Sequence, residues 1–495
     1  MLLIPQSLAY ASLAGVPPIA AISAAIFAPI AAAFFASSPF VQTGPTALTA
    51  LLTVGVLSAM PGLSPEEYAL AAALLALLVG VVRLTLGLAR LGQIAYFMSL
   101  PVLRGFTAAA ALIIVFSQLP VALGLPSSAN TWGGISTVFS QPWSVGATIA
   151  SAAIIVILRL GKRFPALFPT ALVVMVAGLL FTLFGVDLGP TLGAVSGRLP
   201  AFNINLPWAE FPQLAMGAVI IAIAGFSEPT AIARSLSEPG QQWSANKEFV
   251  SQGVANLATS VFSGFPVGAS FARSALSKTA GGKTNMTGLI SGVTVLAMVP
   301  LLPVLSSLPR AVLAAVIIGS VFPLVQIRPL IELWRYARTQ GGTALLTFAL
   351  TLILSPRVDY ALVIGIALAL AIHLIREANL DVKVTVAGRA THVELGGVLW
   401  FGSLERLERL VAKVEGQLEA GDELLIDATP LGRADLSSLM TLFAAEQRLR
   451  KRFVTVEIIG LPARAERVYR RLQHGTYYEI ETDAEAATKQ RTQDG

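Results

Sequence analysis

Two short apolar segments, far apart in the chain, are interrupted in the same way by polar and turn-forming residues. The first is broken at residues 43–46 and the second at residues 268–273. Each break starts a stretch that is too short to cross a bilayer comfortably. A helix begins with unpaired N–H groups and about half a positive charge, so two such ends facing each other, with Arg273 beside them, would hold an anion. Paired broken segments in two halves of a membrane protein are typical of a transporter's binding site.

The residues expected to contact this anion come from the two breaks and from the first apolar span. Gln6 and Tyr10 lie one helical turn apart and offer hydrogen-bond donors, with ordinary hydrogen bonding between helices as the alternative. Thr46 and Ser270 are placed to cap the two short helices, and for Phe271 packing in the core is the favoured alternative. The predicted binding set is Gln6, Tyr10, Thr43, Gly44, Pro45, Thr46, Ser270, Phe271, Ala272 and Arg273.

Glu228 is predicted to be the only acidic residue well inside any span, and we expect it to couple transport to protons. Burial favours the protonated form of a carboxyl group, whereas a nearby cation favours the ionised form. A carboxyl group balanced between the two would take up and release a proton during each cycle. The alternative for both residues is a permanent structural ion pair between Glu228 and Arg273, because a charge at mid-bilayer normally has a partner.

The composition predicts a membrane domain followed by a soluble one. The chain has 495 residues, 55% of them hydrophobic, and a net charge of +6. Its mean hydropathy of +0.73 lies far outside the soluble range. Residues 1–378 carry 18 Lys and Arg and 10 Asp and Glu, whereas residues 379–495 carry 16 and 18. We therefore expect a transmembrane domain over 1–378, a soluble domain over 379–481 and a disordered tail over 482–495.

Apolar runs between turn residues predict a polytopic α-helical membrane protein with about fourteen spans, centred near residues 10, 28, 52, 78, 110, 152, 177, 223, 256, 274, 294, 316, 348 and 367. With both termini cytoplasmic, the loops assigned to the inside hold Arg83, Arg90, Arg159, Lys162, Arg163, Arg234, Lys247, Lys278, Lys283, Arg328, Arg335, Arg338 and Arg376. The outer loops hold only Arg198, Arg310 and Arg357. Fourteen spans with matching breaks in the third span of each half predict two inverted seven-helix repeats.

Beyond the last span the pattern changes to that of a small α/β domain. Alternating residues predict strands over 382–386, 391–398, 423–427 and 454–459, and helical periodicity predicts helices over 403–418, 436–450 and 463–472.

Several other kinds of chemistry lack support in the sequence. The chain has no cysteine, its three histidines are scattered at His373, His392 and His474, and no metal site or cofactor is expected. Residues 281–284 imitate the end of a phosphate-binding loop, but Ser277 stands where its first glycine should be. We therefore expect neither an enzyme nor a nucleic-acid-binding protein.

Several motifs resemble those of the sulfate permease family of anion transporters, and the match covers nearly the whole chain. They are residues 5–18 (PQSLAYASLAGVPP), 41–47 (VQTGPTA), 246–249 (NKEF), 253–256 (GVAN), 262–267 (FSGFPV), 272–275 (ARSA) and 280–284 (AGGKT). The tail is similar to the STAS domain that ends most members. One departure is Ala272, because many members carry a serine just before this arginine.

The resemblance implies two inverted repeats divided into core and gate domains, an anion held between the third and tenth helices, a homodimer, and a cytoplasmic protein partner for the STAS domain. The chain also resembles a bacterial proton-coupled dicarboxylate transporter of the fumarate type, which implies symport in a bacterial inner membrane. Sulfate and bicarbonate transport, an uncoupled anion channel and a membrane-anchored sensor are the alternatives.

Overall fold

The computed structural model describes residues 3–474 except 97–98, 126–130, 162–169, 194, 196, 199 and 239. The chain divides into two compact units, Met1–Ala369 and Leu370–Gly495. Lys162 and Arg163, which entered the orientation argument, lie outside the described residues, as does the tail over 482–495 that we expected to be disordered.

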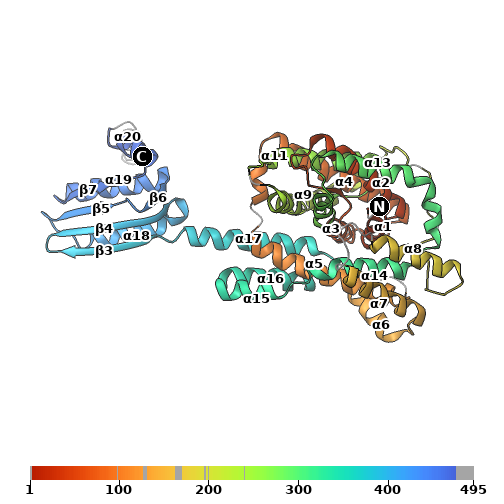
Figure 1. The fold of residues 1–495 in the computed structure, drawn as a ribbon. Coiled ribbons are helices and arrows are strands. Elements are labelled where there is room, and N and C mark those ends of the chain that lie inside the picture. Colours follow the sequence, from red (N-terminus) through yellow and green to blue (C-terminus); the bar gives the residue numbers. More distant parts are fainter. Residues whose placement is uncertain are drawn as a thin grey trace, which may run out of the picture. The chain divides into compact units, whose positions relative to one another are not determined.

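The first unit is built from α-helices (Figure 1). They are α1 (Leu3–Ala14), α2 (Pro18–Phe35), α3 (Ala47–Leu57), α4 (Pro65–Leu88), α5 (Leu100–Ala122), α6 (Thr131–Ser140), α7 (Val145–Leu160), α8 (Thr170–Leu183), α9 (Phe211–Ala224), α10 (Ser227–Leu236), α11 (Ala245–Val261), α12 (Phe271–Thr279), α13 (Met286–Met298), α14 (Arg310–Val321), α15 (Arg328–Tyr336), α16 (Arg338–Ile353) and α17 (Val358–Glu377), the last of which runs into the second unit. Two short strands, β1 (Thr43–Gly44) and β2 (Gly268–Ala269), complete it.

The helix positions agree with the predicted spans, since each of the fourteen predicted centres falls inside a helix. Within the described residues, seven helical runs are long and apolar enough to cross a membrane, and α3, α7 and α8 are shorter apolar helices. This establishes a polytopic helical membrane protein, whose broken elements are individually too short for a simple span.

The helices of this unit pack in two groups, visible in Figure 1 around α2 and around α5. In the first group α11 packs on both α2 and α4, α13 packs on α2, and α9 packs on α4. In the second group α5 packs on α14 and α16, and α7 packs on α14. Helices α1 and α3 belong to the first group and also contact α14 and α5 of the second, so the segments nearest the two breaks lie where the groups meet.

Several features of this unit were not predicted, among them α6, which lies between the spans centred at 110 and 152. The eighth span is broken, because α9 ends at Ala224 and α10 begins at Ser227. The loop predicted between the spans centred at 316 and 348 contains a separate amphipathic helix, α15.

The second unit is the mixed α/β domain that the sequence predicts. Its strands are β3 (Asp381–Ala387), β4 (Ala390–Leu399), β5 (Glu423–Asp427), β6 (Leu431–Ala434) and β7 (Thr455–Ile459), and its helices are α18 (Leu404–Glu415), α19 (Leu436–Lys451) and α20 (Ala463–Gln473). The sheet order is β3-β4-β5-β7, with β3 antiparallel to β4, the other pairs parallel, and β6 paired to β4. Only the short strand β6 was not predicted.

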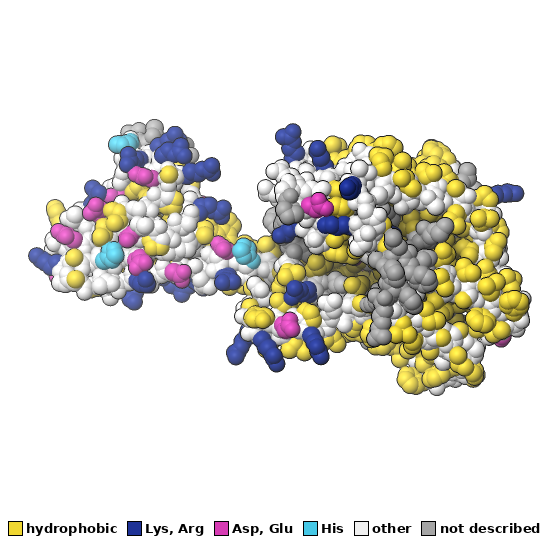
Figure 2. Space-filling model, viewed as in Figure 1, with side chains coloured by type: hydrophobic (Ala, Val, Ile, Leu, Met, Phe, Trp, Pro, Cys, Tyr) yellow, Lys and Arg dark blue, Asp and Glu magenta, His cyan; other side chains and the backbone are white. Residues whose placement is uncertain are grey.

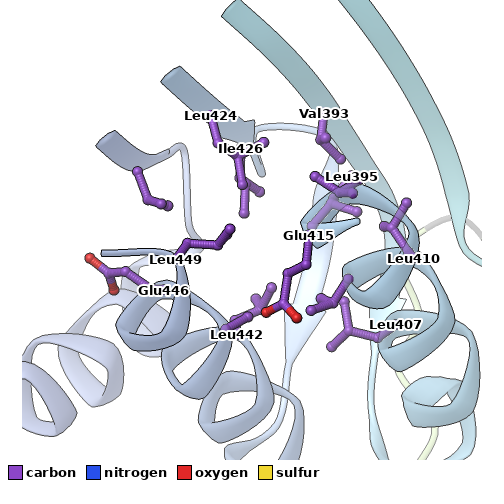
Figure 3. A pocket seen from close by; sticks show the side chains of 14 residues that line it. Val393, Leu395, Leu407, Leu410, Glu415, Leu424, Ile426, Leu442, Glu446 and Leu449 are labelled. Carbon is purple, nitrogen blue, oxygen red and sulfur yellow. The ribbon is translucent and has the colours of Figure 1, made fainter. Parts of the chain in front are cut away.

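Apolar side chains fill the space between this sheet and its helices α18 and α19, and a small gap remains there. Leu424 and Ile426 of β5 face Leu410 of α18 and Leu449 of α19 across it (Figure 3). Its volume of about 20 Å³ holds about one water molecule, so this gap is a packing defect of the core rather than a ligand site.

Candidate functional site

Backbone pairing between β1 and β2 brings the two predicted breaks together. Thr43 pairs with Ala269 and Gly44 with Gly268 in antiparallel register. The Ser270 N–H extends the pairing by donating to the Gln42 carbonyl at 3.1 Å, and the Ser274 hydroxyl accepts from the Gln42 N–H at 2.9 Å. Because each strand leads directly into a short helix, the N-termini of α3 and α12 lie beside one another and the helices leave in opposite directions.

The two helix N-termini differ in how their first N–H groups are satisfied. Thr46 caps α3, since its hydroxyl accepts from the Thr49 N–H at 3.2 Å, as the sequence predicts. Ser270 occupies the corresponding position of α12, but its side chain makes no capping hydrogen bond. The side chains of the next two residues, Phe271 and Ala272, are exposed. The N-terminus of α12 is therefore the end left open for an anionic acceptor.

Phe271 does not lie in the core, the alternative favoured from sequence. Its side chain is 45% exposed at the first position of α12. The error arises because an aromatic residue in an apolar run usually packs inward, whereas here the first turn of α12 presents this ring to open space. The exposed ring adds an apolar surface beside the open helix end.

Arg273 lies in the first turn of α12, and only one of its three guanidinium nitrogens makes hydrogen bonds. Its Nη1 donates to the Pro45 carbonyl at 2.9 Å and to Gln6 Oε1 at 3.4 Å. The residue is 8% exposed, and its Nε and Nη2 atoms are buried without a hydrogen-bond partner. Nε and Nη2 form one edge of the guanidinium fork, the geometry that binds a carboxylate with two parallel hydrogen bonds.

Gly44 explains how the β1 backbone can approach that free edge. It adopts a φ of +153°, a conformation that L side chains rarely adopt, and a Cβ placed there would lie 3.2 Å from Arg273 Nη2. A side chain at this position would therefore strain the backbone and crowd the guanidinium. Tyr10 is buried on α1, one turn from Gln6, and Pro45 contributes its backbone carbonyl to the site.

Glu228 occupies the first turn of α10, directly after the break between α9 and α10. Its Oε2 atom is buried and has no hydrogen-bond partner. Among the residues described, no carboxylate oxygen lies within 4.0 Å of the Arg273 guanidinium, so the structural ion pair considered from sequence is not formed. Glu228 still interacts electrostatically with Arg273 and with a second buried guanidinium, that of Arg83.

Arg83 does not lie in an inner loop as predicted, but inside α4, where its side chain is 0% exposed. Its Nε donates to the Ala222 carbonyl at 3.1 Å, its Nη1 to Val267 at 2.8 Å and its Nη2 to Ile221 at 3.1 Å. Two of these carbonyls belong to the last turn of α9, where Ile221 also accepts from the Gly225 N–H and Ala222 has Arg83 as its donor, and the third immediately precedes β2. Arg83 therefore joins the broken eighth span to the second break.

Helix α11 supplies a further polar layer that was not predicted. Gln252 Nε2 donates to the Thr43 hydroxyl at 2.7 Å and to Glu248 Oε1 at 3.2 Å. Asn256 holds the residue before β2, accepting from the Val267 N–H at 3.0 Å. Glu248 is fully buried and accepts from the Ser37 N–H at 3.1 Å, so Glu228 is not the only acidic side chain buried in this unit. The signal missed was the row of polar residues at 248, 252 and 256, which recurs every four positions on one helix face.

Comparisons with known proteins find matches over most of the chain. Residues 1–347 match the model of the Sulfate permease family. A probable sulfate transporter of Mycobacterium tuberculosis is 34% identical over 394 residues, which cover 76% of this chain and 69% of that protein. The chloroplastic sulfate transporter 4.1 of Arabidopsis thaliana is 30% identical over 396 residues, covering 75% of this chain and 57% of that protein.

Two solved structures share the fold. The murine solute carrier 26 family member A9 anion transporter, in an inward-facing state, has a TM-score of 0.85 over 97% of this chain and 86% of that chain, with 20% identity. The transmembrane domain of a cyanobacterial bicarbonate transporter has a TM-score of 0.61 over 74% of this chain and 93% of that chain, with 22% identity.

Proposed function

Because the chain belongs to the sulfate permease family of anion transporters, we propose that it carries small dicarboxylates of the fumarate type by proton symport. Several of the relatives matched are named as transporters. The observation that carries the proposal is the free Nε and Nη2 edge of Arg273 beside the open N-terminus of α12.

An oxyanion fits this site better than a spherical halide does, and a carboxylate matches the planar edge of the guanidinium. The free edge of the guanidinium presents two parallel N–H donors, which match the two oxygens of a carboxylate. The half-exposed Phe271 ring offers apolar surface to a short carbon chain. Ala272 supplies no hydroxyl, the group that many members place before this arginine.

Proton coupling follows from the charge of such a substrate and from Glu228. Moving a dianion into a cell against 100 mV costs about 4.6 kcal/mol, and two protons carried with it would cancel this cost. Glu228 has a buried carboxylate oxygen with no hydrogen-bond partner, and its charge interacts with those of two arginines. This carboxyl group is placed to carry one of the protons.

The transport cycle in this proposal moves one group of helices past the other. The group containing α2, α4, α9 and α11 is the core domain that holds the site, and the group containing α5, α7, α14 and α16 is the gate domain. Fourteen spans in two inverted repeats would place the α3 and α12 ends at the bilayer midplane, and the antiparallel pairing of β1 with β2 supports this.

The remaining features of the proposal follow from loop charges and from the tail. Arg83 no longer counts as a loop residue, and Lys162 and Arg163 lie outside the described residues. The other basic residues of the inner loops still outnumber those of the outer loops, which favours cytoplasmic termini in a bacterial inner membrane. The C-terminal unit is assigned as a STAS domain that takes a cytoplasmic protein partner, and the transporter as a homodimer.

Uptake of labelled fumarate into proteoliposomes tests the proposal. An inward proton gradient should accelerate uptake severalfold over symmetrical pH, and unlabelled fumarate should compete more strongly than sulfate or bicarbonate. Sulfate is the second candidate because two relatives are named sulfate transporters. Stronger competition by sulfate would favour it, gradient-independent uptake would remove the coupling claim, and single-channel currents would indicate an anion channel.

A further inference from the structure

Helix α15 (Arg328–Tyr336) is too short to cross a membrane and is strongly amphipathic. Nine residues at 1.5 Å rise give a length of about 14 Å, less than half of the hydrocarbon thickness. Leu330 is 1% exposed and packs with Ala108 of α5 and Ala344 of α16, and Leu333 joins this cluster. One narrow face of α15 is therefore fixed to the helices of the second group.

The opposite face of α15 is cationic and exposed. At 100° per residue, Arg328 and Arg335 point away from the Leu330 and Leu333 face. Arg338, at the start of α16, is exposed beside them. In the described part of the chain, no carboxylate lies within 4.0 Å of these three guanidinium groups, and only Glu332 interrupts the basic face. Figure 2 shows this basic cluster over α15 and the start of α16.

Aromatic and aliphatic side chains flank the basic face of α15. Ile331 and Trp334 lie on one flank and are 48% and 47% exposed, and Tyr336 lies on the other and is 87% exposed. Immediately upstream, the exposed Phe322 ring carries the Arg159 guanidinium 4.4 Å from its centroid. Trp and Tyr between apolar and charged groups are characteristic of the membrane–water interface, where an amphipathic helix lies parallel to the surface.

We propose that α15 and the start of α16 form a docking surface for anionic phospholipid headgroups. Arg328, Arg335 and Arg338 contact the lipid phosphates, while Ile331 and Trp334 enter the boundary between headgroups and acyl chains. Because α15 packs on α5 and α16, a bound lipid anchors the second helix group to the bilayer surface. Each arginine near an anionic surface strengthens binding about fivefold, so the three together contribute about 100-fold.

Fluorescence of Trp334 in nanodiscs tests this surface without reference to transport. The full chain is placed in phosphatidylcholine discs that contain either brominated phosphatidylglycerol or brominated phosphatidylcholine at the same fraction. The Trp334 signal is the difference between wild type and Trp334→Phe. Brominated phosphatidylglycerol should quench this signal more strongly, because the arginines enrich that lipid around α15.

Three comparisons decide the outcome. The excess quenching should vanish in the triple variant Arg328→Gln/Arg335→Gln/Arg338→Gln. It should persist when the same three arginines are changed to lysine, which keeps their charge. It should also persist in a charge-matched control in the C-terminal unit, Arg406→Gln/Lys413→Gln/Arg464→Gln. Equal quenching by the two brominated lipids in wild type would overturn the proposal. So would loss of the excess on adding inorganic phosphate at constant ionic strength, because the site would then bind free phosphate rather than lipid.

Discussion

Replacement of Arg273 by glutamine gives the sharpest test of the anion site. In the unliganded protein Nη1 is committed to Pro45, while Nε and Nη2 are buried and free, so a bound carboxylate gains two charge-assisted hydrogen bonds that the protein leaves open. Such bonds contribute about 1.5–3 kcal/mol each. Part of this is offset by desolvation of the carboxylate, and a net loss of about 3 kcal/mol, or roughly 100-fold in affinity, is expected.

The assay is equilibrium binding of labelled fumarate to the purified protein, with thermal unfolding measured in parallel. Arg273→Lys should recover part of the affinity, because it restores the charge but not the two-donor edge. Gly44→Ala should weaken binding with no change of charge, because its Cβ would lie 3.2 Å from Arg273 Nη2. If Arg273→Gln binds fumarate within twofold of wild type while remaining folded, the guanidinium does not hold the substrate and the reasoning fails.

Three further predictions concern the proton, the scaffold and the C-terminal unit. Glu228→Gln should abolish the acceleration of fumarate uptake by an inward proton gradient while leaving counterflow exchange measurable; a retained gradient response would exclude this carboxyl group as the coupling site. Arg83→Met should destabilise the protein by about 3 kcal/mol, because it removes three charge-assisted hydrogen bonds and leaves the Ala222 carbonyl without a donor, while the Ile221 and Val267 carbonyls keep Gly225 and Asn256 as donors. The exposed Arg90→Gln serves as a control and should leave the thermal midpoint unchanged. Tyr469→Phe should lower hydrogen-exchange protection in α20 by about 10–100-fold, because it removes the hydrogen bond that the Tyr469 hydroxyl donates to the buried Glu446 carboxylate. Burial and this hydrogen bond together raise the pKa of Tyr469. Unchanged exchange would show that the bond does not contribute to stability.

The elements that the sequence predicted well are those whose signal is local. In the C-terminal unit, strand β5 (Glu423–Asp427) has the predicted bounds, because a short apolar run lies between polar turn residues. The two breaks at β1 and β2 were also predicted, since glycine and proline interrupt apolar runs there. Local chemistry fixed both results, and neither required knowledge of a distant contact.

The break between α9 and α10 could not be predicted because a distant residue stabilises it. In a continuous helix the Phe226 N–H would donate to the Ala222 carbonyl. Here it donates to the Ile223 carbonyl instead, and the Ala222 carbonyl accepts from Nε of Arg83 in α4. Gly225 leaves room for this guanidinium, since a Cβ there would lie 2.6 Å from Arg83 Nη2. The residues up to Ala224 are apolar and compatible with a helix, and glycine and proline are common in membrane helices, so Gly225 and Pro229 alone do not mark the break that places Glu228 at a helix start.

Arg83 and Arg273 show why residue type and hydropathy do not separate a structural cation from a binding one. Each is an arginine in a helix of the first unit, and each is buried. In Arg83, Nε, Nη1 and Nη2 all donate to backbone carbonyls, so its hydrogen bonding is complete without a ligand. In Arg273 only Nη1 is engaged, and the edge that suits a carboxylate stays open. A buried guanidinium with unmade bonds is costly to keep, and an arriving anion removes that cost. Saturating fumarate should therefore raise the thermal midpoint of wild type and of Arg83→Met, which both keep Arg273, but not that of Arg273→Gln.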